Sequence, residues 1–342
     1  MSEFNQMSVS AIDRITAESV VLTIAVPEEL KPSYQFIAGQ YISLELNIGG
    51  TNVRRSYSIC SAPHSGLLQV GVKAVPQGVF STYVNQRLIV GDQIIVGTPQ
   101  GRFVWKRKSN SLIAIAVGSG ITPIMSIIKS ALHDNPSASC TLLYGNKSPE
   151  KTMFYQELNA LEEKHPHFKI HWVYSQENIP NAQFGRIDTS FILYALNQSS
   201  FSPETVYLCG PEKMITLSET LLREKGISQE NIFFELFTAA EKTQVTNIAQ
   251  KGFLEITCDE FIHKVELSPG KTLLEIALQA KIDVPYSCQG GVCSSCIGKI
   301  THGKATMEAN QILTDDEIEQ GLVLTCQAVA QSESVTVNYD EV

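Results

Sequence analysis

Short runs of apolar and polar residues, separated by glycine, proline and asparagine, dominate the N-terminal third of the chain. The runs have the length of strands and show little helical periodicity. They read SVVLTIAV, YISLELNI, LLQVGVKAV and DQIIVGTP. Short strands at this spacing predict an antiparallel β-barrel or sandwich, which we assign to residues 1–109.

After residue 110 the pattern changes to strands that alternate with amphipathic helices. LIAIAV is a continuous apolar run, as expected for a parallel strand that is buried on both faces. CTLLYGN, FKIHWVYS and VYLCG predict further strands, and MFYQELNALEEKH has apolar residues at helical spacing. The pattern predicts a doubly wound parallel-sheet domain over residues 110–237.

A polar segment without an apolar face, residues 238–251, is predicted to be a linker to a third domain at residues 252–342. There, GFLEITC and HKVELS predict a hairpin, and SVTVNYD predicts a closing strand. TLLEIALQAKI predicts a helix with Thr272 and Glu275 in capping-box register. The chain is therefore predicted to combine α+β and α/β domains.

The third domain has a cluster of cysteines at a distinctive spacing. Cys288, Cys293 and Cys296 form C-x4-C-x2-C, and Cys326 follows after 29 further residues. This is the spacing of ligands to a plant-type [2Fe–2S] cluster. Zinc ribbons use two close cysteine pairs, and no second pair occurs here, although a zinc-bound interaction module remains an alternative.

The net charge of −9 is confined to this third domain. Residues 252–342 contain 14 acidic and 5 basic side chains, whereas residues 1–251 contain 21 of each. An acidic domain disfavours nucleic-acid binding and suits steering towards a basic protein partner. The longest apolar stretch, residues 111–128, is broken by Gly-Ser-Gly and by Pro123, so no membrane association is expected. The N-terminus does not have the pattern of a signal peptide, and we expect a cytoplasmic protein.

A glycine turn follows the first apolar run of the second domain. Gly118 and Gly120 allow a tight turn, Thr122 is expected to cap the next helix, and Pro123 suits its first position. Such a helix N-terminus can bind a pyrophosphate. A tight connection without a ligand is the alternative, because the full G-x-G-x-x-G pattern is absent.

A second segment of this domain, VYLCGPEKM, ends a strand in Cys209, Gly210 and Pro211. The carboxyl edge of a parallel sheet is where α/β folds bind ligands. The alternative is that Cys209 is a small residue buried in the core.

The barrel has a candidate ring-binding strand in RRSYSIC. Alternation places Arg55 and Tyr57 on one face, with Ser56 and Ser58 on the other. An arginine can pair with a phosphate, an aromatic ring can stack on a flat cofactor, and a hydroxyl can bond a ring nitrogen. Downstream, GVFSTYV places Gly78, Ser81 and Thr82 at a possible helix start, which is a second phosphate cradle.

Taken together, these motifs resemble a known family. RSYS, GVFST, GSGITP, YGN, CGPEKM and the cysteine loop occur in the order of the ferredoxin–NADP reductase superfamily with an appended plant-type ferredoxin, and the resemblance covers residues 8–340. It implies an FAD-binding barrel, an NADH- or NADPH-binding domain and a β-grasp [2Fe–2S] domain. The implied activity is that of an NAD(P)H:acceptor oxidoreductase, with an oxygenase component as the electron-accepting partner.

Within this family, YGNKSPEKTMFYQEL, FGRID and LVLTCQ are most similar to reductases that serve phenylacetyl-CoA epoxidase in phenylacetate catabolism. A reductase of a steroid or aromatic-ring hydroxylase would share every motif and is the alternative. A redox-sensing regulator, whose cluster signals without turnover, is a further alternative of a different class.

The resemblance also implies roles for individual residues. Residues at the flavin are Arg55, Ser56, Tyr57, Ser58, Val72, Lys73, Gly78, Ser81 and Thr82. Residues at the dinucleotide are Gly118, Gly120, Thr122, Tyr144, Asn146, Cys209, Gly210 and Pro211. Ser58 would lie near the flavin N5, Cys209 near the nicotinamide C4, and Glu235 and Phe237 near the flavin ring. The implied catalytic residues are Ser58, Cys209 and Glu235.

One departure from the family pattern concerns the choice between NADPH and NADH. Many relatives have arginine after the serine of YSQE, where this chain has Gln176. A contact to the 2′-phosphate of NADPH is therefore in doubt, although Lys147 or Arg186 could replace it.

Overall fold

The computed structural model describes residues 4–106, 109–199, 202–237, 252–286, 289–291, 293–310 and 312–342. The chain divides into two compact units, one that ends at Phe237 and one formed by the C-terminal residues from Thr238 onward. Among the described residues, the second unit begins at Gly252. The linker predicted at residues 238–251 lies outside the described residues.

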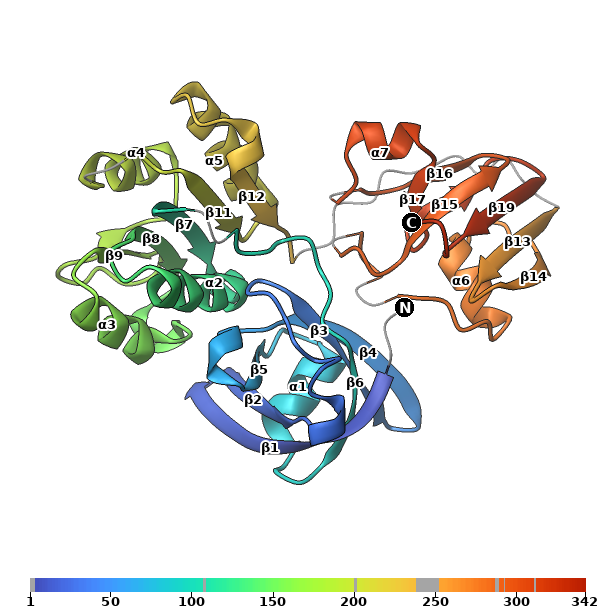
Figure 1. The fold of residues 1–342 in the computed structure, drawn as a ribbon, viewed down its shortest axis with the longest axis horizontal. Helices are drawn as coiled ribbons and strands as arrows, with labels where there is room; N and C mark the ends of the chain where they lie inside the picture. The colour runs from blue at the N-terminus through green and yellow to red at the C-terminus, as the bar shows by residue number, and fades with distance from the viewer. Residues whose placement is uncertain are drawn as a thin grey trace. The chain divides into compact units, whose positions relative to one another are not determined.

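The first unit opens with a six-stranded antiparallel sheet in the order β4-β3-β6-β1-β2-β5 (Figure 1). Its strands are β1 (Phe4–Thr16), β2 (Ser19–Ala25), β3 (Tyr41–Ile48), β4 (Thr51–Ser58), β5 (Leu68–Lys73) and β6 (Gln93–Gly97). A bridge between Ile59 and Val70 joins the end of β4 to β5, so that the sheet curls into a barrel. Alternating side chains such as Leu22, Ile42 and Val96 fill its interior. The predicted barrel is confirmed.

Three short helices accompany the barrel strands. They are η1 (Glu28–Leu30), η2 (Pro63–Ser65) and α1 (Val79–Gln86). The inner face of α1 buries Phe80 and Val84 against the barrel, and its N-terminus follows the predicted GVFST segment.

The second half of this unit is a six-stranded parallel sheet in the order β10-β9-β8-β7-β11-β12. Its strands are β7 (Ser111–Val117), β8 (Ser139–Asn146), β9 (Phe168–Tyr174), β10 (Gln183–Phe184), β11 (Thr205–Cys209) and β12 (Ile232–Glu235). Its helices are η3 (Gly118–Gly120), α2 (Ile121–Asp134), η4 (Pro149–Lys151), α3 (Tyr155–Lys164), α4 (Thr189–Gln198), α5 (Glu212–Glu224) and η5 (Gln229–Asn231). Figure 1 shows α2 and α3 on one face of the sheet, with α4 and α5 on the other. The predicted doubly wound domain is confirmed.

The strand order changes direction beside β7. From β7 the chain moves outward through β8, β9 and β10, and it then returns to place β11 and β12 on the opposite side of β7. The carboxyl ends of β7 and β11 therefore flank the switch point of the sheet, where open α/β sheets bind their ligands.

Polar contacts join the barrel to α2. Ser126 Oγ donates a hydrogen bond to the carbonyl oxygen of Ser61 at 2.6 Å, and Lys129 Nζ donates to that of Cys60 at 3.3 Å. The side chain of Ser126 is fully buried, so this bond satisfies a hydroxyl that has no access to water. These two hydrogen bonds thus connect the barrel to the parallel-sheet domain within the first unit.

The second unit has a five-stranded mixed sheet in the order β14-β13-β19-β15-β17, with a separate β16-β18 pair. Its strands are β13 (Phe253–Cys258), β14 (Phe261–Glu266), β15 (Ile297–His302), β16 (Ala305–Met307), β17 (Leu322–Leu324), β18 (Ala328–Ala330) and β19 (Ser334–Asn338). Its helices are α6 (Leu273–Gln279) and α7 (Asp315–Glu319). The predicted hairpin, closing strand and Thr272–Glu275 capping box are all confirmed.

Within the described ranges, none of the helices is both long enough and apolar enough to span a membrane.

Candidate functional site

The glycine turn and the Cys209 segment meet at the switch point of the parallel sheet. A Cβ atom on Gly120 would lie 2.2 Å from the carbonyl oxygen of Cys209, so only glycine allows this approach of two backbones. Gly118 has a φ of +58° and faces open space, a conformation that L side chains rarely adopt. Two motifs that are far apart in the sequence thus form the two walls of one site.

The start of α2 corrects one prediction. Thr122 is not the N-cap, because α2 begins at Ile121 with Gly120 in the capping position. The Thr122 hydroxyl instead donates to the carbonyl oxygen of Ser119 at 3.1 Å, and Pro123 is the third helical residue. The reason is that η3 runs directly into α2, which moves the helix start by two residues. The N-terminus of α2 still lies at the switch point, although the backbone N–H of its first residue, Ile121, donates to the carbonyl oxygens of Gly118 and Ser119 in η3.

Tyr144 and Asn146 lie at the end of β8. Tyr144 is fully buried, and its hydroxyl donates to the carbonyl oxygen of Gly118 at 2.9 Å, so that it fixes the glycine turn. Burial raises the pKa of Tyr144, and the hydroxyl therefore remains a donor. The Asn146 side chain is also buried, and it interacts with the Tyr144 hydroxyl, which opposes part of the rise in the pKa of Tyr144. A polar side chain at this edge of the sheet suits a polar ligand.

Ser58, Cys209 and Glu235 converge from three strands. Ser58 ends β4, is 4% exposed, and donates from Oγ to Glu235 Oε2 at 3.3 Å. The parallel register of β11 and β12 pairs Cys209 with Glu235. A residue of the barrel is therefore bonded to a residue of the parallel sheet, across 177 positions of sequence.

The electrostatics of this group keep its members uncharged. Burial raises the pKa of Glu235 to about 8, against the opposing effect of the Ser58 hydrogen bond. Burial also raises the pKa of the Cys209 thiol well above its usual value, and the nearby Glu235 carboxyl adds to the shift. Near neutral pH the group is a hydroxyl, a thiol and a protonated carboxyl. It lacks the thiolate that nucleophilic catalysis would require, and instead offers neutral donors to a planar ligand.

The barrel has a cavity of about 360 Å³ at the N-terminus of α1. Its lining residues are Ile48, Gln77, Gly78, Val79, Thr82, Tyr83, Gln86 and Arg87. The helix N-terminus and the guanidinium of Arg87 suit a phosphate-bearing ligand. Gln77, Tyr83 and Arg87 were not predicted from the sequence, although the helical spacing of residues 79, 82, 83, 86 and 87 would have placed them on one face.

The three residues predicted to bind a phosphate at the start of α1, Gly78, Ser81 and Thr82, have two different roles in the structure. Gly78 and Thr82 line the cavity, whereas the Ser81 hydroxyl accepts a hydrogen bond from the backbone N–H of Val75 at 3.2 Å. A Cβ atom on Gly78 would lie 2.4 Å from Val75 Cγ2 and 2.6 Å from Ser81 Oγ. Ser81 therefore shapes the loop that leads into α1.

Other predicted flavin residues lie around the barrel rather than at this cavity. Arg55 is exposed and donates to the carbonyl oxygen of Arg54 at 2.6 Å. Tyr57 packs against Phe80, with 5.6 Å between ring centroids, and burial raises its pKa. Ser56, which lies between them on β4, is only partly exposed.

Val72 and Lys73, at the end of β5, face different surroundings. The Val72 side chain is fully buried in the barrel core and can meet a ligand only through its main chain. Lys73 is partly buried, and burial lowers its pKa, against the opposing charge of Glu18. Lys147 and Lys151 lie near enough to lower it further, so a set of ammonium groups adjoins the ends of β5 and β8.

The other predicted dinucleotide residues border the switch point. A Cβ atom on Gly210 would lie 2.7 Å from Met214 Cε, and Pro211 occupies the N-cap position of α5. Gln176 follows β9 and donates from its backbone N–H to the carbonyl oxygen of Lys147 at 2.9 Å. Phe237 is 39% exposed and is the last described residue of this unit.

In the second unit, three of the four predicted metal ligands lie within the described residues. Cys293, Cys296 and Cys326 are buried and not joined in disulfides. Cys288 lies outside the described residues. The segments that hold the cysteines are tied together, because the backbone N–H and the hydroxyl of Thr325 both donate to the carbonyl oxygen of Cys296, at 3.0 and 2.9 Å.

The described cysteines fit an iron–sulfur cluster by their chemistry. Thiolates are the ligands of such clusters, and Cys293, Cys296 and Cys326 are buried thiols that are not joined in disulfides.

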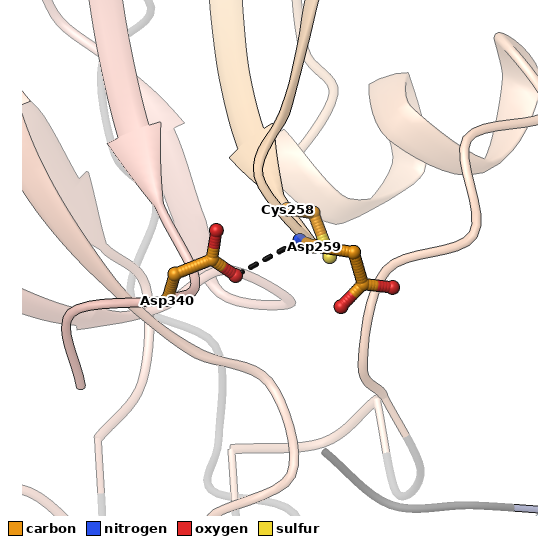
Figure 2. A group of neighbouring side chains, drawn as sticks. All are labelled: Cys258, Asp259 and Asp340. Atoms are coloured by element: carbon orange, nitrogen blue, oxygen red, sulfur yellow. Dashed lines mark hydrogen bonds between the residues drawn. The ribbon is translucent and has the colours of Figure 1, made fainter.

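One tight group of potential ligands does occur elsewhere in this unit, formed by Cys258, Asp259 and Asp340 (Figure 2). The Asp340 carboxylate accepts hydrogen bonds from the backbone N–H groups of Asp259 and Glu260, both at 2.9 Å. These two residues have φ values of +57° and +66°. The carboxylate therefore stabilises the strained turn between β13 and β14, which is a structural role.

Three family models match successive parts of the chain. Residues 6–105 match the oxidoreductase FAD-binding domain, residues 114–220 the oxidoreductase NAD-binding domain, and residues 256–331 the 2Fe-2S iron-sulfur cluster binding domain.

Relatives of similar length match almost the whole chain. The sequence is 33% identical to a subunit of the 1,2-phenylacetyl-CoA epoxidase of Escherichia coli (strain K12), over 99% of each chain. It is 30% identical to the ferredoxin reductase component of 3-ketosteroid-9-alpha-monooxygenase of Rhodococcus rhodochrous, over 97% of this chain and 96% of that protein. The fold is that of phthalate dioxygenase reductase, with a TM-score of 0.65 and 23% identity over 98% of each chain.

The chain belongs to the ferredoxin–NADP reductase superfamily, in the branch that carries a C-terminal plant-type ferredoxin domain. It is an oxidoreductase with FAD, a nicotinamide dinucleotide and a [2Fe–2S] cluster as its cofactors.

Proposed function

We propose that this protein is the reductase component of a multicomponent oxygenase and that its partner is phenylacetyl-CoA epoxidase. The observation that carries the proposal is the meeting of Ser58 with Glu235 and Cys209. Ser58 comes from the flavin-binding barrel, whereas Cys209 and Glu235 come from the dinucleotide domain. A reaction between a nicotinamide and a flavin needs both rings at such a junction.

When bound, the nicotinamide supplies a hydride, and the flavin and the cluster convert it into single electrons for a partner protein. The residues of the chain bind and orient these groups. We propose that Gly118 and the N-terminus of α2 hold the pyrophosphate of the dinucleotide and that Asn146, at the end of β8, adjoins it. Gly78, Thr82 and Arg87, which line the cavity beside α1, are proposed to hold phosphate of the flavin nucleotide.

The catalytic assignments follow from the environment of the junction. Ser58 offers a hydroxyl to the flavin ring, and Glu235 holds a proton at its carboxyl near neutral pH. Cys209 contributes an uncharged thiol beside Glu235, where we propose that the nicotinamide ring binds. Neutral side chains at this point avoid a fixed charge that would oppose hydride transfer.

We further propose that residues 1–109, 110–237 and 252–342 are the three domains, and that residues 238–251 connect them. In the cluster domain, Cys288, Cys293, Cys296 and Cys326 are the proposed ligands. The excess of acidic residues in this domain supports docking to a basic patch on the oxygenase.

The choice of oxygenase rests on sequence similarity. The relative that is 33% identical over almost its full length belongs, by its name, to an epoxidase acting on phenylacetyl-CoA. Reductase components of a 3-ketosteroid monooxygenase, at 30% identity, make a steroid-hydroxylase reductase the alternative.

The first test is the visible spectrum of the purified protein before and after anaerobic addition of NADPH or NADH. Flavin bands with broad cluster absorbance, bleached by one of the nucleotides, are expected. A colourless protein that binds zinc would contradict the proposal.

The second test identifies the partner. The protein is supplied as the only reductase to the oxygenase components of phenylacetyl-CoA epoxidase and, separately, of a 3-ketosteroid hydroxylase. Substrate-dependent oxidation of NAD(P)H is expected with the epoxidase and phenylacetyl-CoA. Equal or faster turnover with the steroid system would favour the alternative, and cytochrome c reduction controls for intact electron transfer.

A further inference from the structure

Cys326 lies between two buried polar side chains. Thr325 is 0% exposed and Gln327 is 2% exposed, although threonine and glutamine are residues that usually contact water. Burial of a polar side chain is costly unless its hydrogen bonds are satisfied inside the protein. The partners of these two side chains therefore indicate why they are there.

Both side chains reach the loop that carries the other cysteines. Thr325 donates to the carbonyl oxygen of Cys296 and accepts from the hydroxyl of Tyr339, both at 2.9 Å. On the other side of Cys326, Gln327 Nε2 donates to the carbonyl oxygen of Gln289 at 3.2 Å. The fourth cysteine is thus held against the loop by a bond from each of its neighbours.

Gln327 has a further contact that Thr325 lacks. Its Nε2 lies 3.6 Å from the sulfur of Cys326 and 3.0 Å from the carbonyl oxygen of the same residue. The amide has two N–H groups, and with Gln289 it has three acceptors within reach. The sulfur therefore shares a donor with two carbonyl oxygens.

The position of the amide is fixed by packing. A Cβ atom on Gly291 would lie 3.0 Å from Gln327 Cγ, so the stem of the glutamine lies directly against the glycine of the cysteine loop. Gly291 has a φ of +74°, which brings the backbone close to the side chain. The loop therefore confines the stem of the glutamine, and the bonds of Nε2 to the carbonyl oxygens of Gln289 and Cys326 orient the amide towards the sulfur.

An N–H group directed at a cluster sulfur affects the reduction potential. Hydrogen bonds to the ligand sulfurs are one of the factors that set this potential. Reduction adds negative charge to the cluster, so a hydrogen-bond donor stabilises the reduced form more than the oxidised form. Loss of the donor therefore lowers the potential.

We propose that Gln327 is a positioning residue that raises the reduction potential of the cluster through an N–H···S bond to Cys326 and holds residues 289–291 in place. The proposal rests on the [2Fe–2S] centre of the proposed function. It assigns to one side chain a role that the cysteine spacing does not reveal.

The test is an EPR-monitored redox titration of the intact protein and of two variants. Gln327→Met preserves the length of the side chain but removes the donor, and Gln327→Glu replaces the N–H groups by a second oxygen. Both are expected to lower the midpoint potential, by up to about tenfold in the one-electron equilibrium, or about 59 mV. Gln320→Met, the same change at an exposed position, is the control and is expected to leave the potential unchanged.

A second measurement does not depend on the stability of the variants. In wild-type protein labelled with ¹⁵N at glutamine side chains, pulsed EPR of the reduced cluster is expected to show a ¹⁵N coupling in place of the corresponding ¹⁴N coupling of unlabelled protein. Unchanged potentials in the variants, or no such coupling in the wild type, would overturn the proposal. A protein that has no [2Fe–2S] signal at all would instead refute the proposed function.

Discussion

The two units of the molecule build their sites in opposite ways. In the second unit, three of the four proposed ligands come from one short loop, and only Cys326 comes from elsewhere. In the first unit, Ser58 and Glu235 are 177 residues apart and meet because the barrel packs against the parallel sheet. A site of the first kind depends on local spacing, whereas a site of the second kind depends on the whole topology. Substitutions should therefore have local effects in one unit and widespread effects in the other.

The substitution with the largest expected effect distinguishes electron transfer through the cluster from reduction of the flavin. Cys293→Ser removes a buried ligand of the proposed cluster, so reduction of cytochrome c is expected to fall to the level without enzyme. Reduction of the flavin by the nicotinamide nucleotide should persist, because no residue of the first unit is altered. Stopped-flow spectra of flavin bleaching and a cytochrome c assay measure the two steps. Equal loss of both steps would show that the units do not work separately.

A substitution at the switch point tests the dependence on topology. Gly120→Ala places a Cβ atom 2.2 Å from the carbonyl oxygen of Cys209, and the forced displacement of main chain is expected to lower the free energy of unfolding by about 1–3 kcal/mol. We also expect a raised KM for the nucleotide, because the turn at Gly118 moves with it. Thermal unfolding and steady-state kinetics are the measurements, with Ser119→Ala as the neighbouring control. Wild-type behaviour of Gly120→Ala would contradict the close approach.

The buried carboxyl gives the first unit a pH dependence that the cluster loop lacks. The pKa of Glu235 is about 8 in the folded protein, above its value in an unfolded chain, so the folded state binds the proton more tightly. Stability from this group is fully present below about pH 4 and is lost as pH rises through about 8. Glu235→Gln, which cannot ionise, is therefore expected to be more stable than wild type by about 2–4 kcal/mol at pH 9. Near pH 4, wild type and Glu235→Gln should have the same free energy of unfolding.

The measurement is thermal or denaturant unfolding of both proteins across this pH range. Glu230→Gln, a substitution at an exposed position of η5, is the matched control. A constant difference between wild type and Glu235→Gln at every pH would show that the carboxyl is not buried in its neutral form.

The smallest expected effect concerns the independence of the units. Thr272→Ala removes the capping box of α6, where Thr272 Oγ1 accepts from Glu275 N at 3.2 Å, and costs about 1 kcal/mol. Only the second unit should be destabilised, as followed by cluster absorbance, while flavin fluorescence reports the first unit. Thr314→Ala, at the exposed capping box of α7, is expected to have a smaller effect. A matching loss of both signals would mean that the units unfold together.

The same contrast explains how much could be predicted from the sequence. Strands such as β3 and β7 were predicted because their apolar residues recur with a strand period or form a continuous run. The longest strand of the barrel, β1, was missed because its buried side chains are few, Met7 and Val9 among them, and its register with β2 is interrupted. Bulges of this kind weaken the alternation that identifies a strand.

The sites show the same limits. Spacing alone indicated a cluster at Cys293, Cys296 and Cys326, because most of its ligands lie close together on one loop. No local pattern could reveal that Ser58 bonds to Glu235, and this pair was suggested only by family resemblance. The cavity residues Gln77 and Arg87 belong to no motif, because Gln77 precedes α1 and Arg87 follows it, and only the fold brings both to the cavity.

The bonds from Thr325 to Cys296 have a consequence for how the protein is made. On the ribosome, the loop with the first three cysteines is synthesised before Cys326, so the two bonds from Thr325 to the carbonyl oxygen of Cys296 form only after β17 has been made. The proposed set of four cysteines is complete only when Cys326 has also been synthesised. A nascent chain that stalls before this point would therefore carry the first three thiols without their fourth partner.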